Sequence, residues 1–417
     1  MILGVIADDF TGATDVAGML VGAGMRTVQV IAVPDGPPPQ ADAVVVALKS
    51  RTAPVDAAVA ESLAALHWLR AGGARQFYFK YCSTFDSTPA GNIGPVAEAL
   101  MKALGSDFTI TCPAFPENGR TVFRGHLFVA DQLLSDSGMR HHPLTPMTQS
   151  DLVQVLQAQS RGRVGLARYD VVARGPDALR DRLAELREGG IRLAVVDAID
   201  NAALRTIAAA CIDLPLLTAG SGVALGLPAA YEARGWLQPT AAAAQLPAVG
   251  GRGAVLAGSC SQATHAQVAH WCEQGRPAMR IDAPTLVADP GAMARTLAWI
   301  EAQGDHPVLV YTTASPEEVK ANQAALGTHV AGERVERFLA DVAVALVERG
   351  VRRLVVAGGE TSGAVVQALG VKQLRIGAPI DPGVPWTQAE GRPLLLALKS
   401  GNFGAVDFFS KALAQAQ

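Results

Sequence analysis

The chain has 417 residues, of which 49% are hydrophobic and 18% charged, and its formal net charge is −3. This composition excludes a disordered chain, and the lack of a basic stripe argues against nucleic acid or an anionic membrane as a partner. The length exceeds what one core ordinarily fills, so we expect two domains.

The first half alternates short β-branched runs with segments whose apolar residues recur at helical spacing. Val55–Ala71 and Gly91–Leu104 are such helical segments. Short buried strands that alternate with helices predict parallel βαβ units. The predicted strands are Ile2–Ala7, Thr27–Ala32, Ala43–Leu48, Phe77–Tyr81, Phe108–Cys112, Leu193–Asp197 and Leu216–Ala219.

Residues 236–251 interrupt this pattern, because they are rich in Ala, Pro and Gly and carry almost no charge. We interpret them as a linker between a domain at 1–235 and a second domain at 252–417. The predicted fold class is therefore α/β, with two domains whose sheets are largely parallel. The strands expected after the linker are Ala254–Ala257, Ala278–Ile281, Val308–Tyr311, Leu354–Ala357, Lys372–Ile376 and Leu394–Leu398.

Asp8 and Asp9 follow the first predicted strand directly, and Thr11-Gly12 then leads into a helix. Ligands of open α/β sheets bind at the carboxyl ends of the strands, which makes this segment a candidate pocket. Helix capping is the alternative, since Asp and Thr accept bonds from free first-turn N–H groups. Capping explains one acid and one hydroxyl but not two adjacent acids followed by Asp15, so both interpretations stay open.

The loop Lys80–Gly94 combines one cation with a dense set of hydrogen-bond donors and acceptors. Such a set suits a small anion that carries several hydroxyl groups. The alternative is an ordinary helix cap, because Ser and Thr are common in loops. The polar residues are Lys80, Ser83, Thr84, Asp86, Ser87, Thr88 and Asn92.

Two further segments carry arginine. Arg51 follows the strand Ala43–Leu48, and a guanidinium there is suited to hold a carboxylate by two parallel bonds, although a lone Arg is more often only solvated. The segment Asn118–Phe128 predicts a polar loop and hairpin that presents Arg120, Arg124 and His126. His126 is either a base or a structural histidine.

Three strand ends of the second domain are rich in glycine and serine. A strand followed by Gly-Ser and a helix exposes N–H groups at a positive helix end, which suits phosphate, and paired glycines allow a close approach. None of the segments matches GxxxxGK[ST] or GxGxxG, so a nucleotide site of another type is the remaining inference. Thr218–Gly222 in the first domain has a similar sequence, which leaves open which loops hold the nucleotide. The three segments are Gly258–Ser261, Gly358–Gly363 and Lys399–Gly404.

The remaining features concern compartment and assembly. The five cysteines are odd in number and form no CxxC, which favours a reduced cytoplasmic setting over disulfides or a zinc site. We expect no signal peptide and no membrane span, because the N-terminus lacks a basic region and no apolar run is long enough. A homodimer is the default assembly.

Taken together, these motifs resemble the four-carbon acid sugar kinase family. The family pattern ADD-[LF]-TGA-x-D is matched by Ala7–Asp15, GGETSG by Gly358–Gly363, and the closing K-x-GxFG by Lys399–Gly404. The resemblance covers essentially the whole chain, and the segments Lys80–Val96 and Cys112–Val129 are most similar to the 3-oxo-tetronate kinase branch. The threonate and erythronate branch carries DSTLRG, where this chain reads Asp86–Gly91 with Pro-Ala in place of Leu-Arg.

The resemblance implies ATP-dependent phosphorylation of the C4 hydroxyl of a four-carbon acid sugar, foremost 3-oxo-tetronate (3-dehydro-erythronate), in the catabolism of such acids. It also implies a sugar-acid domain followed by a nucleotide domain, with the active site in the interdomain cleft. We expect Mg²⁺ to bridge the phosphates mostly through water, with few protein ligands and none assigned. Threonate or erythronate phosphorylation by the same family is the alternative.

Roles are assigned as hypotheses on this basis. Asp8 or Asp9 is the expected catalytic base, with Asp86 as a rival, and Arg51 and Lys80 are expected to hold the substrate carboxylate. The other expected substrate-binding residues are Thr11, Ser83, Asp86 and Ser87. The expected nucleotide-binding residues are Ser259, Gly358, Gly359, Glu360, Thr361, Gly401 and Gly404.

Two other classes of function compete with a kinase. A two-domain small-molecule sensor would use the same acidic loop to hold a ligand without turnover. A phosphatase would use Asp8 and Asp9 with Mg²⁺, but it calls for a DxD spacing, and here the two acids are adjacent and are followed by Phe10.

Overall fold

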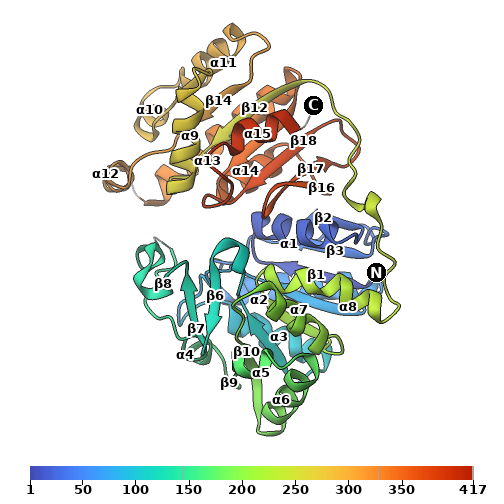
Figure 1. Cartoon of the computed structure of the whole chain (residues 1–417). Coiled ribbons are helices and arrows are strands. Elements are labelled where there is room, and N and C mark those ends of the chain that lie inside the picture. The colour runs from blue at the N-terminus through green and yellow to red at the C-terminus, as the bar shows by residue number, and fades with distance from the viewer. Residues whose placement is uncertain (143, 327, 416–417) are drawn as a thin grey trace. The chain divides into compact units, whose positions relative to one another are not determined.

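The computed structural model describes residues 1–142, 144–326 and 328–415 (Figure 1). The chain divides into two compact units, Met1–Ala244 and Gln245–Gln417, and the division falls inside the segment predicted as a linker. The early part of that segment packs on the first unit, where Thr240 N donates to Gly24 O at 2.9 Å. The interdomain location of the active site stays a prediction.

The first unit contains a sheet whose strands are all parallel, in the order β2-β3-β1-β4-β11-β5-β10-β9. The central strands β1, β3 and β4 are buried along their whole length, as expected for a parallel sheet covered on both faces. The sequence missed β9. The strands are β1 (Leu3–Ala7), β2 (Thr27–Ile31), β3 (Ala43–Ala47), β4 (Gln76–Lys80), β5 (Thr109–Cys112), β9 (Arg163–Ala167), β10 (Ile191–Val196) and β11 (Leu216–Ala219).

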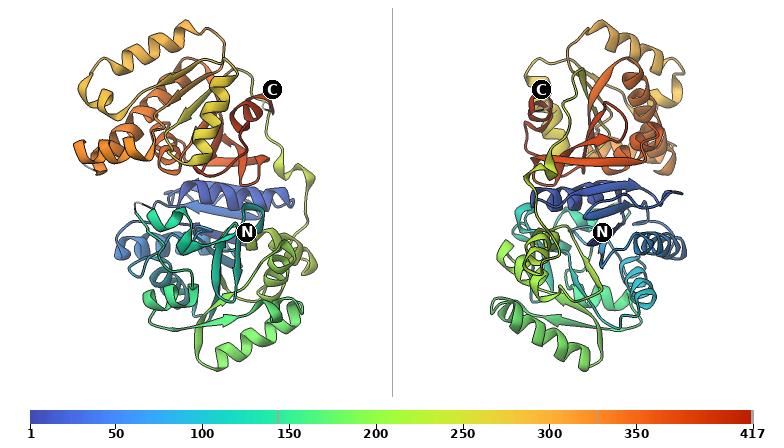
Figure 2. Two further views of the ribbon diagram at one scale, coloured as in Figure 1. Left: turned by 60° about the vertical axis from the view of Figure 1, so that its left-hand side comes forward. Right: turned by 90° about the vertical axis from the view of Figure 1, so that its right-hand side faces the viewer.

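The direction in which the chain winds reverses at β1. The connection from β1 to β2 runs to one side of β1, whereas the connection from β3 to β4 crosses to the other side. Right-handed crossovers in opposite directions place their helices on opposite faces of the sheet (Figure 2). The helices are α1 (Phe10–Gly22), α2 (Val55–Ala71), α3 (Ile93–Leu104), α4 (Leu152–Gln159), α5 (Tyr169–Val172), α6 (Pro176–Glu188), α7 (Asn201–Ala210) and α8 (Leu227–Ala233).

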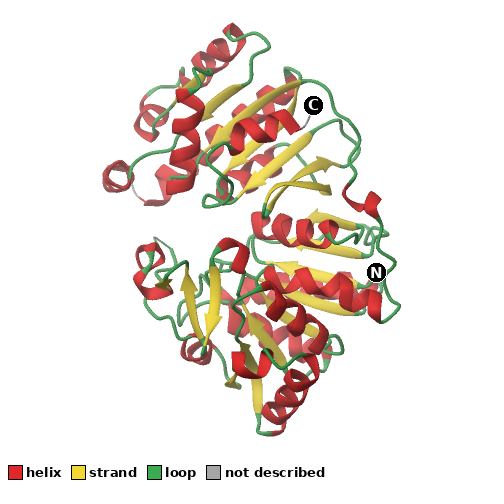
Figure 3. Ribbon diagram, in the orientation of Figure 1, coloured by secondary structure: helices red, strands yellow, loops and turns green. Residues whose placement is uncertain are grey.

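A small antiparallel sheet, β6-β7-β8, follows β5 in the first unit (Figure 3). The predicted hairpin is confirmed, since β6 pairs with β7 and Arg124 occupies the turn at φ 50°. Asp197 fixes this turn by accepting from the backbone N–H groups of Arg124 and Gly125, both at 2.8 Å. The elements are β6 (Arg120–Phe123), β7 (His126–Val129) and β8 (Gln132–Leu133), with short 3-10 turns η1 (Pro116–Asn118), η2 (Leu134–Asp136), η3 (Gly138–His141), η4 (Gly222–Gly226) and η5 (Ala241–Ala244).

The second unit has a mixed sheet in the order β13-β14-β12-β15-β18-β17-β16. The pairings from β13 to β18 are parallel, and β17 pairs antiparallel with both of its neighbours. The sequence missed β17, and Lys372–Ile376 proved to be the start of a longer strand, β16. The strands are β12 (Arg252–Ala257), β13 (Ala278–Arg280), β14 (Val308–Tyr311), β15 (Val351–Ala357), β16 (Gln373–Asp381), β17 (Val384–Ala389) and β18 (Leu395–Lys399).

The core of this second unit is apolar around Trp271, Trp386, Phe408 and Phe409. No helix in the described part of the chain has the length and apolar character that a membrane span requires. The helices are α9 (Gln262–Glu273), α10 (Ala283–Ala288), α11 (Ala292–Ala302), α12 (Pro316–Leu326), α13 (Thr328–Glu348), α14 (Gly359–Ala368) and α15 (Phe408–Gln415).

Candidate active site

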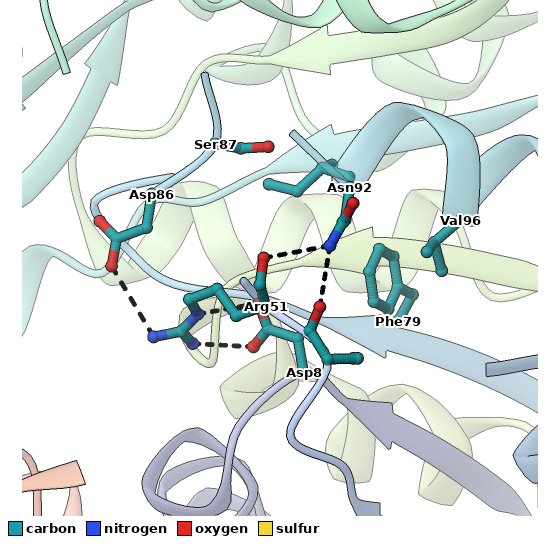
Figure 4. A pocket seen from close by; sticks show the side chains of 9 residues that line it. Asp8, Arg51, Phe79, Asp86, Ser87, Asn92 and Val96 are labelled. Carbon is teal, nitrogen blue, oxygen red and sulfur yellow. Dashed lines mark hydrogen bonds and ion pairs between the residues drawn. The ribbon is translucent and has the colours of Figure 1, made fainter. Parts of the chain in front are cut away.

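Arg51 gathers the acids at the carboxyl ends of β1, β3 and β4. Its Nε and Nη2 donate to the two carboxylate oxygens of Asp8 at 2.9 and 2.7 Å, and Nη2 also donates to Asp9 Oδ1 at 2.6 Å. Its Nη1 lies 3.7 Å from Asp86 Oδ2 (Figure 4). Because three carboxylates of the protein surround this guanidinium, its contacts favour a role in ordering the acids over the expected grip on a substrate carboxylate.

The loop that carries Arg51 is held in place by Asn92. The Asn92 amide donates to the carbonyl oxygens of Ser50, Arg51 and Ala53 at 2.8, 3.2 and 2.9 Å. Asn92 therefore positions the guanidinium without touching it. Several residues of these segments line a small pocket (Figure 4): Asp8, Ser50, Arg51, Phe79, Asp86, Ser87, Asn92, Ile93 and Val96.

Asp9 is the N-cap of α1. Its carboxylate accepts hydrogen bonds from Gly12 N at 3.1 Å and from Thr11 Oγ1 at 2.8 Å. The Thr11 hydroxyl, expected to bind substrate, therefore donates to the capping carboxylate. Burial alone would raise the pKa of Asp9, but the charges of Arg51 and Lys80 outweigh it and hold the pKa below its ordinary value. The capping interpretation of the opening motif is thus confirmed for Asp9, which also pairs with Arg51, while the ligand-binding interpretation stays a prediction.

Asp8 differs from its neighbour. Burial raises the pKa of Asp8 against the opposing attraction of Arg51, and the negative charge of Asp9 adds to the rise. Two adjacent acids whose pKa values are moved in opposite directions are typical of a site in which one accepts a proton and the other stays ionised. This contrast favours Asp8 as the proton acceptor.

Asp86 is held in a strained backbone conformation. Phe85 and Asp86 have φ values of 65° and 44°, in the left-handed region that non-glycine residues rarely adopt. Thr84 Oγ1 donates to Asp86 Oδ1 at 2.7 Å, and the other carboxylate oxygen faces Arg51. Such strain, of the order of 1–3 kcal/mol per residue, is common where a functional side chain must be aimed.

The two serines of this loop are less directly engaged. Ser87 Oγ donates to Gln159 Oε1 at 3.1 Å, which ties the loop to the end of α4. Ser83 is buried in the same loop. Ser87 lines the pocket, whereas the geometry gives no particular role to Ser83.

Lys80 is the last residue of β4 and is 2% exposed. Its Nζ donates to Tyr81 O at 2.9 Å. The ammonium lies against the start of α1, since a Cβ placed on Gly12 would be 2.8 Å from Lys80 Nζ and 2.3 Å from Asp9 Oδ1. Glycine at position 12 therefore lets a helix start, a carboxylate and an ammonium pack together.

Asp15 is a further acid at this site that the expected set of site residues omitted. Ser221 Oγ donates to Asp15 Oδ2, while Asp15 Oδ1 is buried and has no hydrogen-bond partner among the described residues. Burial raises the pKa of Asp15 to about 6, opposed by the charge of Lys80. The signal was its place in the opening motif, one helical turn after Thr11-Gly12.

The Thr218–Gly222 loop contacts Asp15 and the Pro113-Ala114 segment of the first unit. A Cβ on Gly220 would lie 2.6 Å from Pro113 O, and one on Gly222 would lie 2.2 Å from Ala114 O. Its glycines thus serve close packing of the backbone, and Ser221 serves Asp15. These contacts favour a role of the loop in the first site, and the identity of the nucleotide loops stays a prediction.

In the second unit, the predicted nucleotide loops follow three adjacent parallel strands, β12, β15 and β18. Gly358 N donates to Lys399 O at 2.9 Å, and a Cβ on Gly401 would lie 2.3 Å from Ser259 Oγ. Gly358, at φ 130°, precedes α14, whose first residues are Gly359, Glu360 and Thr361. Except for Gly404, which ends the loop after β18, the expected residues meet at one edge of the sheet, where two helices also begin.

Lys399 organises that edge, and the expected set of site residues omitted it. Its Nζ donates to Thr264 Oγ1, Ser400 O and Gly401 O at 3.0, 3.0 and 2.9 Å. Burial lowers the pKa of Lys399 to about 7, because no ion pair to this ammonium occurs within the described residues to offset the lost hydration. The signal was present, since Lys399 ends its strand as Lys80 does.

The remaining part of this loop is anchored by Gln267. Its amide donates to the carbonyl oxygens of Phe403, Gly404 and Ala405 at 3.0, 3.0 and 3.1 Å. Ser261 caps α9 and donates to Gly401 O at 2.5 Å. Backbone N–H groups at helix starts, held beside a buried ammonium, are suited to bind phosphate.

Comparison with known families gives two matches that together cover most of the chain. Residues 3–227 match the model of a sugar-binding N-terminal domain, and residues 254–409 match the model of a nucleotide-binding C-terminal domain.

Curated relatives match over nearly their full length. The 3-oxo-tetronate kinases of Cupriavidus necator and Pseudomonas fluorescens are each 62% identical over 99% of this chain and 97% of the relative. The 3-oxo-tetronate kinase of Brucella melitensis is 50% identical over 99% of this chain and 95% of the relative.

Two solved structures share the fold. A crystal structure from Salmonella typhimurium LT2, provisionally called a tRNA synthase, has a TM-score of 0.88 at 46% identity and covers 100% of this chain and 99% of that one. A Haemophilus influenzae protein has a TM-score of 0.78 at 44% identity, with 99% and 100% covered.

Proposed function

The chain belongs to the four-carbon acid sugar kinase family, and we propose that it transfers the γ-phosphoryl group of ATP to the C4 hydroxyl of 3-oxo-tetronate. The observation that carries the proposal is the 62% identity to curated 3-oxo-tetronate kinases over 99% of the chain. The alternative within the family, threonate or erythronate, gains no support from the structure, because Ala90, where that branch carries Arg, is an exposed residue without charge.

The first unit supplies the acceptor side of the reaction. We propose that Asp8 orients the hydroxyl of the sugar acid and accepts its proton late in the transfer. Arg51 holds the Asp8 carboxylate in place by two hydrogen bonds. The raised pKa of Asp8 and the lowered pKa of Asp9 support this assignment. Asp9 stays ionised and keeps the start of α1 in position.

The bond changes follow from the acceptor geometry. The hydroxyl oxygen of the sugar acid attacks the γ-phosphorus, the bond from that phosphorus to the bridging oxygen breaks, and ADP leaves with the electron pair. The proton of the hydroxyl passes to Asp8. Since the transition state is loose, positioning and charge stabilisation account for most of the rate enhancement.

The second unit supplies the nucleotide side. We propose that Ser259, the N–H groups of residues 358–361 and the Gly401–Gly404 loop surround the phosphates, with Lys399 as the buried charge behind them. Lys399 uses its three N–H groups on the protein, so it would attract phosphate through its charge rather than through a direct bond.

Mg²⁺ is part of the proposal in a limited sense. The described residues contain no group of three or more His, Cys, Asp or Glu side chains that could hold a metal. We propose that the ion would bind to the nucleotide and keep most of its waters, as Mg²⁺ commonly does in kinases. When bound, it neutralises charge on the β- and γ-phosphates.

The compartment and the assembly are proposals of the same kind. A cytoplasmic setting agrees with five cysteines that are all free, two of them, Cys112 and Cys211, fully buried. A homodimer is proposed only as the commonest assembly, and light scattering on the purified chain tests it.

The experiment that tests the function is ADP release with ATP, Mg²⁺ and a panel of 3-oxo-tetronate, threonate and erythronate. We expect 3-oxo-tetronate to have the highest kcat/KM. Asp8→Asn should lower kcat by about 10²- to 10⁴-fold with little change in KM, as for a base that acts in the transition state. No ADP with any member of the panel would refute the kinase assignment and leave a sensor as the better account.

A further inference from the structure

We consider three cationic side chains of the first unit, Arg51, Lys80 and Arg120. Arg51 and Lys80 already interact with acids or carbonyl groups of the protein. Arg51 is surrounded by Asp8, Asp9 and Asp86. Lys80 binds a backbone carbonyl and lies close to the buried acids of α1. A sugar acid brings another carboxylate into this group of acids, so it needs a cation that these acids do not already hold.

Arg120 is the third cation and has no such partner. No carboxylate forms an ion pair with it among the residues that the structure describes. Within the described ranges, its one side-chain hydrogen bond goes from Nη1 to Asn118 O, and its Nε is buried without a partner. A buried guanidinium N–H that lacks an acceptor favours the binding of an anionic ligand.

The backbone of Arg120 is fixed on both sides. Arg120 begins β6, pairs in register with Val129, and exchanges backbone hydrogen bonds with Phe115 at 2.8 and 3.0 Å. The side chain is only partly exposed, so its direction is limited. This is a rigid presentation of a cation, in contrast to a surface arginine that is free in solvent.

The backbone connects Arg120 to the Asp15 end of the site. Its partner Phe115 follows Ala114, whose carbonyl oxygen lies 2.2 Å from a Cβ placed on Gly222. Gly222 is next to Ser221, which donates to Asp15. Burial lowers the pKa of Arg120, and the attraction of Cys82, Asp86 and Asp15 opposes this effect. Asp86 faces Arg51, and Asp15 carries a buried carboxylate oxygen without a partner. Arg120 thus begins a strand whose backbone partner packs beside the Asp15 end of the site.

From these contacts, and on the basis of the proposed function, we propose that Arg120 is the residue that binds the carboxylate of the sugar acid and so selects an acid over an uncharged four-carbon sugar. A planar guanidinium can hold a carboxylate by two parallel N–H···O bonds. The neighbouring Asn118 Nδ2 is also buried without a partner and is suited to donate to an oxygen of the same ligand.

Kinetics with a neutral analogue test this proposal. Erythrulose has the carbon skeleton of 3-oxo-tetronate with a hydroxymethyl group in place of the carboxylate, and it serves as substrate or competitive inhibitor. We expect Arg120→Ala to raise KM for 3-oxo-tetronate by about 10- to 150-fold, the equivalent of one charge-assisted contact. The KM or inhibition constant of erythrulose should be the same in Arg120→Ala as in the wild type.

Two further variants separate charge from structure. Arg120→Lys keeps the charge but loses the planar fork, so its KM should lie between those of the wild type and Arg120→Ala. Arg124→Ala is the matched control, because Arg124 is exposed in the turn of the same hairpin and lies over the Phe123 ring. We expect its kinetics to equal those of the wild type.

A test on the unmodified protein covers the case in which the Arg120 variants do not fold. Phenylglyoxal modification of Arg120, followed by mass spectrometry, should be slowed by 3-oxo-tetronate or erythronate and not by erythrulose. Equal protection of Arg120 from phenylglyoxal by the sugar acid and by erythrulose overturns the proposal. An equal rise in Arg120→Ala of the constants for 3-oxo-tetronate and erythrulose overturns it as well. If no sugar acid yields ADP, the kinase assignment fails, while the protection assay still decides the role of Arg120.

Discussion

Gly12 offers a direct test of how the first site is packed. A Cβ at this position would lie 2.3 Å from Asp9 Oδ1 and 2.8 Å from Lys80 Nζ, whereas ordinary contacts begin near 3.4 Å. Lys80 has a long side chain that can yield. Asp9 has a short one that is held by Thr11 and Arg51, so in Gly12→Ala the carboxylate or the start of α1 must move by about 1 Å.

The size of the effect follows from two contributions. Loss of the Asp9 cap costs about 0.5–2 kcal/mol, and the weaker pair with Arg51 adds to it. Alanine in a helix recovers up to about 1 kcal/mol relative to glycine. We therefore expect a net loss of about 1 kcal/mol in stability, but a fall in kcat of about 100-fold, since a 1 Å displacement at a catalytic site has that order of effect.

The assay compares Gly12→Ala with Gly22→Ala, which lies in the same helix and meets nothing within 4 Å of the added Cβ. Urea denaturation measures stability, and ADP release measures turnover. The control should be more stable by about 0.5–1 kcal/mol and fully active. Native turnover in Gly12→Ala would refute the argument that Asp9, Lys80 and α1 are packed against one another.

Three further predictions concern charged groups. The pKa of Asp15 rises from 3.8 to about 6 on folding, so the folded state keeps this proton longer and wild-type stability should fall by about 3 kcal/mol as pH rises from about 3 to about 7. Asp15→Asn should remove that part of the fall, and parallel urea midpoints between pH 4.5 and 7.5 in both proteins would contradict it. Binding of the anionic ATP should raise the lowered pKa of Lys399, so the enzyme should take up a proton when ATP binds. Calorimetry at pH 7.5 in buffers of different ionisation enthalpy should detect this uptake in the wild type and none in Lys399→Met. Equal uptake in both proteins would show that another group takes the proton. Asp86→Gly should be more stable than Asp86→Ala by about 1 kcal/mol, because glycine tolerates φ 44°, with both variants equally impaired in turnover; equal stability in denaturation would mean that the strain is absent.

The sequence was sufficient to predict the elements that depend on local pattern. The fully apolar strands β1, β3 and β4 were recognisable because parallel strands are buried on both faces. Their carboxyl ends then placed Asp8, Arg51 and Lys80 at one edge of the sheet, and the structure confirms that edge. The strand β17 was missed because its alternation is broken by Pro385, which lies in an antiparallel pair with a register shift.

The partners of the charged groups could not be predicted from the sequence. A pattern shows that Arg51 lies at a strand end, but not that Asp8, Asp9 and Asp86 converge on it from segments about 35 to 43 residues away. Likewise, Ser221 meets Asp15 across 206 residues, a contact that depends on the strand order β1-β4-β11. Local spacing carries no information about such tertiary contacts, which decide whether a cation faces the protein or a ligand.

The two lysines that end their strands illustrate this difference. Lys80 and Lys399 are both buried, and each Nζ donates to the carbonyl of the next residue. In the first unit the ammonium lies near Asp9 and Asp15, so its charge stabilises the ionised form of these two acids. In the second unit no described carboxylate forms an ion pair with Lys399, and the uncompensated charge favours an anionic ligand. The same local geometry thus serves buried acids in one unit and leaves an uncompensated charge in the other, and the difference lies in the acids around each lysine.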